Sequence, residues 1–210
     1  MNYGNANDLI QKCPQCTESI DKHRISLIRS SDKTDALVRK LQDYLTKVNI
    51  SAILKGLELD RTSTMAGAAI VSFNTSAQPR QYVTVSGPGV LLLKHIASMG
   101  KDVTIVDMAN ALVGQNKVHN IKKATIEPNT EKGIEYPLGS CAAQKLLTAI
   151  FRDGASADTI KSIEMSEIMW RAAGESAGPG SRQWSSGEIV PSCKTCKQVL
   201  PQMLCNLLDD

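Results

Sequence analysis

Residues 137–154 have the sequence PLGSCAAQKLLTAIFRDG, which combines a helix start, an apolar stripe and a helix stop. Ser140 is a favourable N-cap, because its hydroxyl can accept a hydrogen bond from a backbone N–H of the first turn. The apolar residues that follow recur at helical spacing and are Leu146, Leu147, Ile150 and Phe151. Asp153 and Gly154 end the pattern. The segment therefore predicts an amphipathic helix over 141–152 that begins at a cysteine.

Segments rich in strand-forming residues lie on both sides of this helix in the sequence. Residues 66–74 (AGAAIVSFN) and 81–87 (QYVTVSG) are separated by Ser and Pro residues within 75–80. They predict an antiparallel hairpin. Three further elements are expected: a short helix over 89–99, a buried strand or strand–helix junction over 102–108, and a strand over 159–170.

The first 57 residues or so are polar and have a helical pattern. Ser31 and Asp32 can cap a helix over roughly 34–47. The change of pattern after this segment predicts an N-terminal helical extension at 1–60 and one larger domain at 61–210.

The composition is that of an ordinary globular protein, with 42% hydrophobic and 21% charged residues. The net charge of +3 neither requires nor excludes a nucleic-acid partner. Aromatic residues make up only 4% of the chain, which argues against a broad stacking platform for single strands. No apolar run is long enough to span a membrane, so no membrane partner is expected.

Six cysteines carry most of the candidate chemistry. Residues 191–196, PSCKTC, predict a second helix with Cys193 and Cys196 beside its first turn. At a helix N-terminus the free N–H groups lower the pKa of a thiol and favour the thiolate that binds metal. Cys141, Cys193 and Cys196 thus predict a zinc site with one open position, which is the catalytic arrangement. The alternative is three buried structural cysteines.

The order of these motifs is similar to that of a known family. Cys141-Ala142-Ala143 on a capped helix, then a strand, then PSCKTC on a second helix resembles the zinc-dependent cytidine deaminase superfamily, which carries H/C-x-E and P-C-x-x-C. The resemblance covers roughly residues 65–210. It implies an α/β fold with three layers, α/β/α, in which helices enclose a mixed sheet. It also implies an enzyme that hydrolyses the amino group of cytosine to give uracil.

The chain departs from the family pattern at three points. Ala143 occupies the position of the family's Glu, which is the general acid and base, so the chain is expected to be nearly inactive. It is either a natural pseudoenzyme or a Glu-to-Ala variant of a toxic enzyme, and the intact cysteines favour the variant. Ser192 separates Pro191 from Cys193. The two strands that usually follow the second motif are not evident, so either N-terminal strands complete the sheet or the sheet is smaller.

The resemblance also implies a substrate and partners. In the family the loop before the second motif borders the substrate; here Arg182, Trp184 and Ser185 can contact phosphate or stack on a base. A solvated loop is the alternative. The expected substrate is cytosine in nucleic acid, with single- or double-stranded DNA favoured over RNA. A toxin or mutator type of deaminase is favoured. Such a protein is expected to be cytoplasmic or to be delivered into a target cell, and an immunity protein is a further possible partner. The rival hypotheses are a free cytidine or nucleotide deaminase and a non-catalytic zinc-stabilised binding module.

The remaining cysteines leave several interpretations open. Cys13 and Cys16, in the sequence CPQC, can form half of a second zinc site together with His23. A redox pair and plain exposed cysteines are the alternatives. Cys205 is expected to be a core residue of the last helix.

Overall fold

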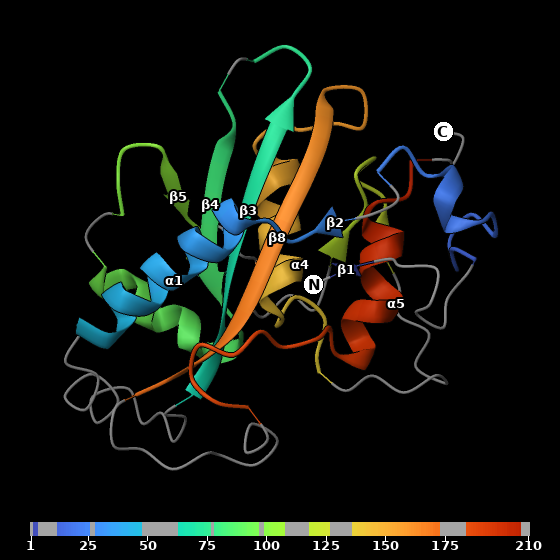
Figure 1. Ribbon diagram of the computed structural model, residues 1–210. Helices are drawn as coiled ribbons and strands as arrows, with labels where there is room; N and C mark the ends of the chain where they lie inside the picture. The colour runs from blue at the N-terminus through green and yellow to red at the C-terminus, as the bar shows by residue number, and fades with distance from the viewer. Residues whose placement is uncertain are drawn as a thin grey trace.

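A mixed sheet with helices on both faces forms the described part of the molecule (Figure 1). The computed structural model describes residues 2–3, 12–25, 28–47, 63–76, 78–96, 99–107, 118–126, 136–172 and 184–206. The strands are β1 (Asn2–Tyr3), β2 (Ile28–Arg29), β3 (Ser63–Phe73), β4 (Arg80–Val85), β5 (Val103–Ile105), β6 (Val118–His119), β7 (Thr125–Ile126) and β8 (Ile160–Arg171). The α-helices are α1 (Asp32–Lys47), α4 (Ala142–Arg152) and α5 (Lys194–Met203), and two 3-10 helices are η1 (Ile20–Lys22) and η2 (Gly87–His95).

The main sheet has the strand order β1-β2-β8-β3-β4-β5. β3 pairs antiparallel with both β4 and β8, so the predicted hairpin is confirmed. β5 runs parallel to β4, and β2 runs parallel to β8. The two shortest strands, β6 and β7, form a separate antiparallel pair.

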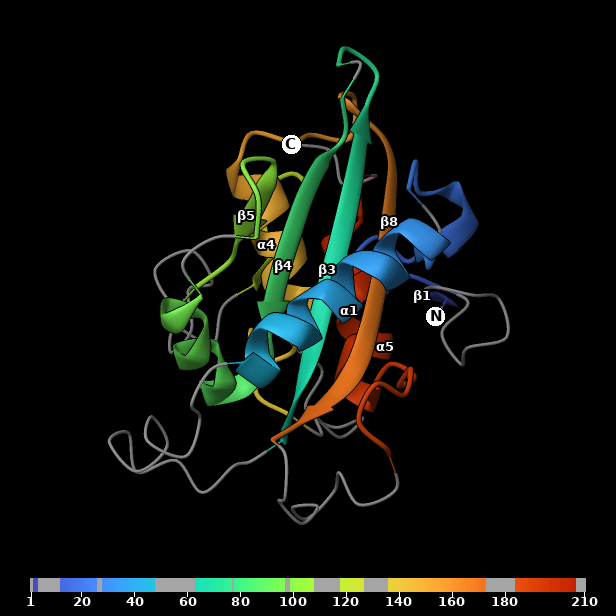
Figure 2. The same ribbon diagram turned by 60° about the vertical axis from the view of Figure 1, so that its left-hand side comes forward.

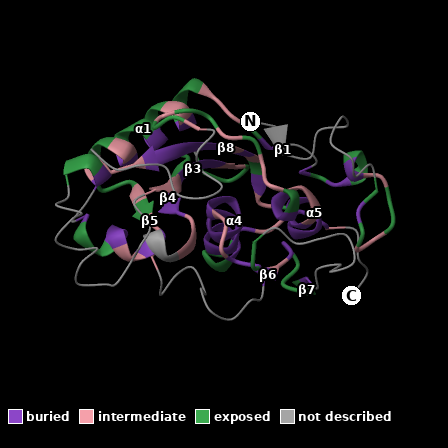
Figure 3. Ribbon diagram, turned by 90° about the horizontal axis from the view of Figure 1, so that it is seen from below, coloured by how far each residue is buried: buried purple, intermediate pink, exposed green. Residues whose placement is uncertain are grey.

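Alternation along the strands produces two core layers, one on each face of the sheet. In β3, Ala68 and Ile70 pack with α1, whereas Ala69 and Val71 pack with α4 and α5. Viewed from below, α1 lies on one side of the strands and α4 and α5 lie on the other (Figure 3). Figure 2 shows that α1 crosses the strands obliquely on one face of the sheet. The predicted three-layer α/β/α architecture with a mixed sheet is confirmed.

Two helix starts differ from the predictions. The N-cap of α4 is Cys141 and not Ser140, because the Ser140 hydroxyl instead donates to the Pro137 carbonyl oxygen at 2.6 Å. The helix expected over 89–99 is the 3-10 helix η2, which begins earlier, at Gly87, with Pro88 at its start. The predicted strand over 159–170 is confirmed as β8.

The N-terminal segment takes part in the same sheet. β2 extends the sheet beyond β8, and α1 packs on β3 and β8. Ser31 caps α1 through its hydroxyl, which lies 3.3 Å from the Thr34 nitrogen and also donates to Glu164 of β8 at 2.6 Å. N-terminal strands therefore complete the sheet, which was one of the two alternatives. The domain division near residue 60 stays a prediction. No helix in the described ranges has the length and apolarity needed to cross a membrane.

Candidate metal centre

Two helix N-termini meet beside β8, and a cysteine is the N-cap of each. Cys141 precedes α4, and Cys193 precedes α5. The segment that leads to Cys193 is held against β8: the Met169 N–H donates to the Glu188 carbonyl oxygen at 2.9 Å, and Gly187 N–H donates to the Met169 carbonyl oxygen at 2.7 Å. This pairing along β8 places the start of α5 next to the start of α4.

The three sulfur atoms lie close enough to share one metal ion. The Sγ atoms of Cys141, Cys193 and Cys196 are all within 4.8 Å of one another, and those of Cys141 and Cys193 are 3.6 Å apart. Two sulfurs bound tetrahedrally to one zinc ion at about 2.3 Å would be about 3.8 Å apart. The spacing and the thiol donor set thus fit a metal ion of the size of zinc, with a fourth position left for another ligand.

Hydrogen bonds within the cluster distribute the charge unequally. The thiols of Cys141 and Cys196, followed by the backbone N–H groups of Cys196 and Thr195, lower the pKa of Cys193 to about 3 against the effect of burial. The hydrogen bond to Cys193 raises the pKa of Cys141, and hydrogen bonds with its two neighbours raise that of Cys196. The helix N-terminus was expected to lower the pKa of both N-cap thiols. That expectation is wrong for Cys141, whose pKa is raised because of its hydrogen bond to Cys193 and its burial.

A buried carboxylate accompanies the cluster. Glu167 of β8 is only 5% exposed, and its Oε1 accepts a hydrogen bond from the Ala143 N–H at 3.0 Å. The carboxyl group thus lies at the N-terminus of α4, where the helix dipole favours negative charge. Sequence inspection missed Glu167, although a charged residue between Met165 and Ile168 in a buried strand was an available signal.

Polar side chains of α4 and α5 fix the backbone around the cysteines. Gln144 accepts from the Gly139 N–H at 2.7 Å through Oε1, and its Nε2 lies 3.6 Å from the Cys196 sulfur. Thr195 Oγ1 accepts from the Tyr136 N–H at 3.0 Å, which ties α5 to the chain before α4. These contacts connect both helix starts directly, so the three sulfurs keep their relative positions.

Lys145 is a fully buried lysine in the first turns of α4. Its Nζ donates to the carbonyl oxygens of Val85 at 2.8 Å and Gly87 at 3.0 Å, which anchors α4 to the end of β4. Burial lowers the pKa of Lys145 to about 8, and the nearby Cys141 acts in the opposite direction.

Two of the three predicted substrate-binding residues lie in the described part of the loop before α5, and Arg182 lies outside it. Trp184 is half-buried, and its carbonyl oxygen accepts from the Arg171 guanidinium. Ser185 is exposed, and its N–H donates to Glu188 at 2.7 Å. Among the described residues no hydrogen bond joins either one to the three cysteines. Their role in substrate binding stays a prediction.

Comparisons with known proteins assign no family. No protein-family model matches the chain, and neither a curated protein nor a solved structure matches it significantly. The functional argument therefore depends on the site itself.

Proposed function

We propose that this chain is a zinc-binding protein of the deaminase type, whose active form hydrolyses the amino group of cytosine in nucleic acid. The observation that carries the proposal is the convergence of Cys141, Cys193 and Cys196 at two adjacent helix N-termini on one face of an α/β sheet. Three ligands leave one coordination position open, which is typical of catalytic zinc. When bound there, zinc would act as a Lewis acid that activates water.

The protein's own residues supply positioning in this proposal. The three sulfurs would hold the metal, and Gln144, which contacts both the Gly139 N–H and the Cys196 sulfur, would keep the helix starts in register. Glu167 holds the N–H of residue 143 and so fixes the first turn of α4.

Proton transfer is the step that this chain lacks. Hydrolysis of a cytosine amine requires a group that takes a proton from water and gives one to the leaving amine. Ala143 has only a methyl group, so the chain as it stands is expected to be nearly inactive. In Ala143→Glu, a carboxylate at this position would restore proton transfer.

The test of the enzyme proposal is a gain of function. Ala143→Glu and Ala143→Gln are compared on single-stranded DNA, duplex DNA, RNA and free cytidine, with uracil formation as the readout. Uracil is expected with Glu and not with Gln, which has the same size but transfers no proton. The nucleic-acid substrates are expected to be converted, whereas free cytidine is expected to remain unchanged. Absence of conversion on all four substrates by a folded, zinc-loaded Ala143→Glu protein would refute the enzyme proposal.

The metal step has its own test. The purified protein is expected to hold zinc that Cys193→Ala removes, because the variant lacks the central ligand of the cluster. Lys194→Ala is the matched control, since it changes an exposed residue between the two ligands of α5 without changing a sulfur. Zinc that remains bound at the same stoichiometry in Cys193→Ala would contradict the proposed ligand set.

A non-catalytic zinc-stabilised binding module is the second candidate, and the burial of position 143 favours it. Ala143 is 0% exposed and packs in the core on the α4 side of the sheet. If a glutamate does not fit there, Ala143→Glu will lower the melting temperature and give no uracil. If it fits, the variant keeps its stability in the presence of zinc.

A further inference from the structure

A second group of metal-ligating side chains lies apart from the three cysteines of the candidate centre. It consists of Cys13, Cys16, His23 and Cys205, whose ligand atoms all lie within 4.8 Å of one another. Cys13 and Cys205 are 0% exposed, and His23 is 3% exposed. Two distant parts of the chain, the N-terminal loop and the end of the last helix, thus contribute to one buried cluster.

The loop that carries Cys13 and Cys16 is a tight turn. The Cys13 N–H donates to the Glu18 carbonyl oxygen at 2.8 Å, and the Thr17 N–H donates back to the Cys13 carbonyl oxygen at 2.9 Å. Thr17 adopts a positive φ of 61°, which closes the turn. The Cys13 side chain in this turn is fully buried. The buried Cys13 is closed to exchange with an external thiol, whereas Cys16 is half-buried.

His23 completes the ligand set at the end of η1. Its backbone N–H donates to the Ile20 carbonyl oxygen at 3.0 Å. The ring Nε2 lies 3.4 Å from the Cys16 sulfur. A sulfur and an imidazole nitrogen bound tetrahedrally to one zinc ion would be about 3.6 Å apart. The other ring nitrogen, Nδ1, is buried without a hydrogen-bond partner among the described residues, so the only polar contact of the ring there is with the Cys16 sulfur.

The apolar packing around this cluster is slight. Within the described residues, the only aliphatic side chain of the local core is Ile20, and the other members are the cysteines themselves. One aliphatic side chain buries too little surface to compensate for the conformational entropy lost by an ordered loop. Small units with so little core usually depend on a metal ion or on disulfides, and all the cysteines are free.

We propose that Cys13, Cys16, His23 and Cys205 bind one structural zinc ion that fastens the N-terminal segment to the end of α5. Three sulfurs and one imidazole complete a tetrahedral set with no open position, as in structural zinc sites. This donor set favours zinc over magnesium or calcium, which take oxygen ligands. None of these four ligands belongs to the candidate centre at Cys141.

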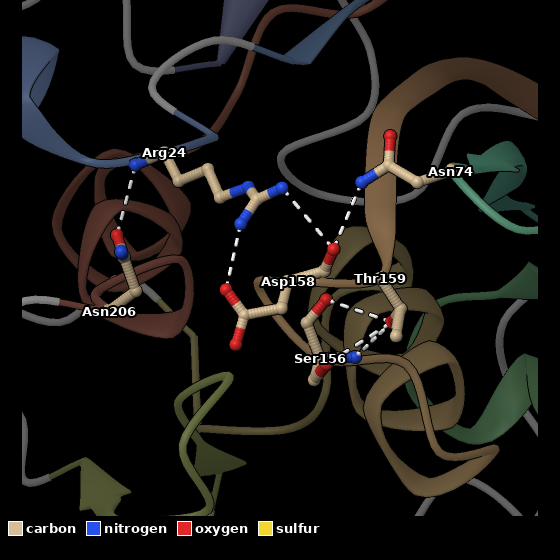
Figure 4. Close-up of polar contacts among 6 residues, drawn as sticks. All are labelled: Arg24, Asn74, Ser156, Asp158, Thr159 and Asn206. Atoms are coloured by element: carbon tan, nitrogen blue, oxygen red, sulfur yellow. Dashed lines mark hydrogen bonds and ion pairs between the residues drawn. The ribbon is translucent and has the colours of Figure 1, made fainter.

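Polar contacts next to the cluster join the same two parts of the chain (Figure 4). The Arg24 N–H donates to Asn206 Oδ1 at 3.0 Å, and the Arg24 guanidinium contacts the Asp158 carboxylate at 2.7 Å and its carbonyl oxygen at 3.2 Å. Arg24 directly follows His23, and Asn206 directly follows Cys205. The sequence neighbours of two ligands are therefore themselves held together, which keeps the ligands at coordinating distance.

The test measures zinc bound per full-length chain by mass spectrometry of the metal. The wild-type chain is expected to hold two zinc ions. Cys141→Ser/Cys193→Ser is expected to hold one, and this remaining ion should be lost when Cys16→Ser and His23→Gln are added. His119→Gln, at a histidine outside both clusters, is the matched control and should keep both ions. Because Cys141→Ser/Cys193→Ser removes only the candidate centre, zinc at this site is measured without it, and failure of this site is distinguishable from failure of the proposed function.

A conservative variant and a labelling measurement guard against loss of folding. Cys16→His retains a ligand and is expected to keep the zinc that Cys16→Ser loses. In the wild-type chain, alkylation of the half-buried Cys16 should accelerate at least tenfold when a chelator removes the metal. The proposal is overturned if folded Cys141→Ser/Cys193→Ser contains no zinc, or if the chelator leaves the alkylation rate of Cys16 unchanged.

Discussion

Gly67 allows α4 to approach the sheet, and its replacement by alanine gives a sharp test of the geometry around Cys141. Gly67 lies in β3 opposite Glu167 of β8. A Cβ atom at this position would lie 2.9 Å from the Ala142 Cβ and 3.3 Å from Leu146 Cδ1. Carbon atoms in favourable contact are about 3.5 to 4.0 Å apart, so Ala142 would have to move by roughly 0.6 to 1 Å. Because Ala142 directly follows Cys141, the displacement would reach the metal ligand.

The sign of the change in free energy of unfolding shows whether the clash or the ordinary preference of a strand for alanine over glycine dominates in Gly67→Ala. Without a steric conflict, replacing a strand glycine by alanine would stabilise the fold by about 0.5 to 1 kcal/mol. Overpacking a tight core costs about 1 to 3 kcal/mol. We therefore expect Gly67→Ala to lower the free energy of unfolding by about 1 to 2 kcal/mol net, with a loss of zinc affinity at the Cys141 cluster.

A double-mutant cycle measured by urea unfolding identifies the cause. Ala142→Gly removes the atom that Gly67→Ala would meet, so the double variant should be more stable than the sum of the two single effects predicts. Zinc affinity, measured by competition with a chelator, should recover in parallel. Additive effects, or a Gly67→Ala protein as stable as the wild type, would refute the close approach of β3 and α4.

Three further predictions concern charged groups. The pKa of Lys145 falls from 10.5 to about 8 on folding, so between these values the unfolded chain binds more protons. The difference in free energy of unfolding between the wild type and Lys145→Met should therefore rise in favour of the wild type from pH 8 to pH 10.5, by at most about 3 kcal/mol. A difference that does not change with pH would contradict this. Glu167→Ala should destabilise the fold by about 1 to 2 kcal/mol in urea unfolding, because the Ala143 N–H loses its buried acceptor, and Glu167→Gln should cost less. Arg24→Ala should cost under about 1 kcal/mol and lose most of that effect at high salt, since its partner Asp158 is exposed; a larger, salt-independent loss would count against a surface pair.

Local patterns in the sequence predicted the elements that have long, regular periodicity. The helix over 141–152 was located to within a residue, because its apolar stripe repeats over several turns. The strand over 159–170 was also located to within a residue, although its alternation of apolar and polar residues is imperfect. The hairpin of β3 and β4 followed from two β-rich segments and the turn between them. The order of the motifs alone predicted that Cys141, Cys193 and Cys196 lie close together.

Contacts between distant segments were not predictable in the same way. β2 has two residues, too few for any periodicity, yet it pairs with β8. Nothing local indicates that Cys205 joins Cys13, because that contact depends on where α5 ends in space. The N-cap of α4 was misplaced by one residue, since Ser140 uses its hydroxyl in the preceding turn.

The position of α5 connects the two proposed metal sites. This helix has ten residues and contains Pro201, which lacks an N–H, so it would be unstable in isolation. Cys193 and Cys196 lie at its start, and Cys205 follows its end. Between these ends, apolar residues such as Leu200 pack against α4 in the shared core. Metal bound at either end would therefore limit the ways in which α5 can shift or unwind, and the cluster that fastens the N-terminal segment would also help to hold the sulfurs of the candidate centre at coordinating distance.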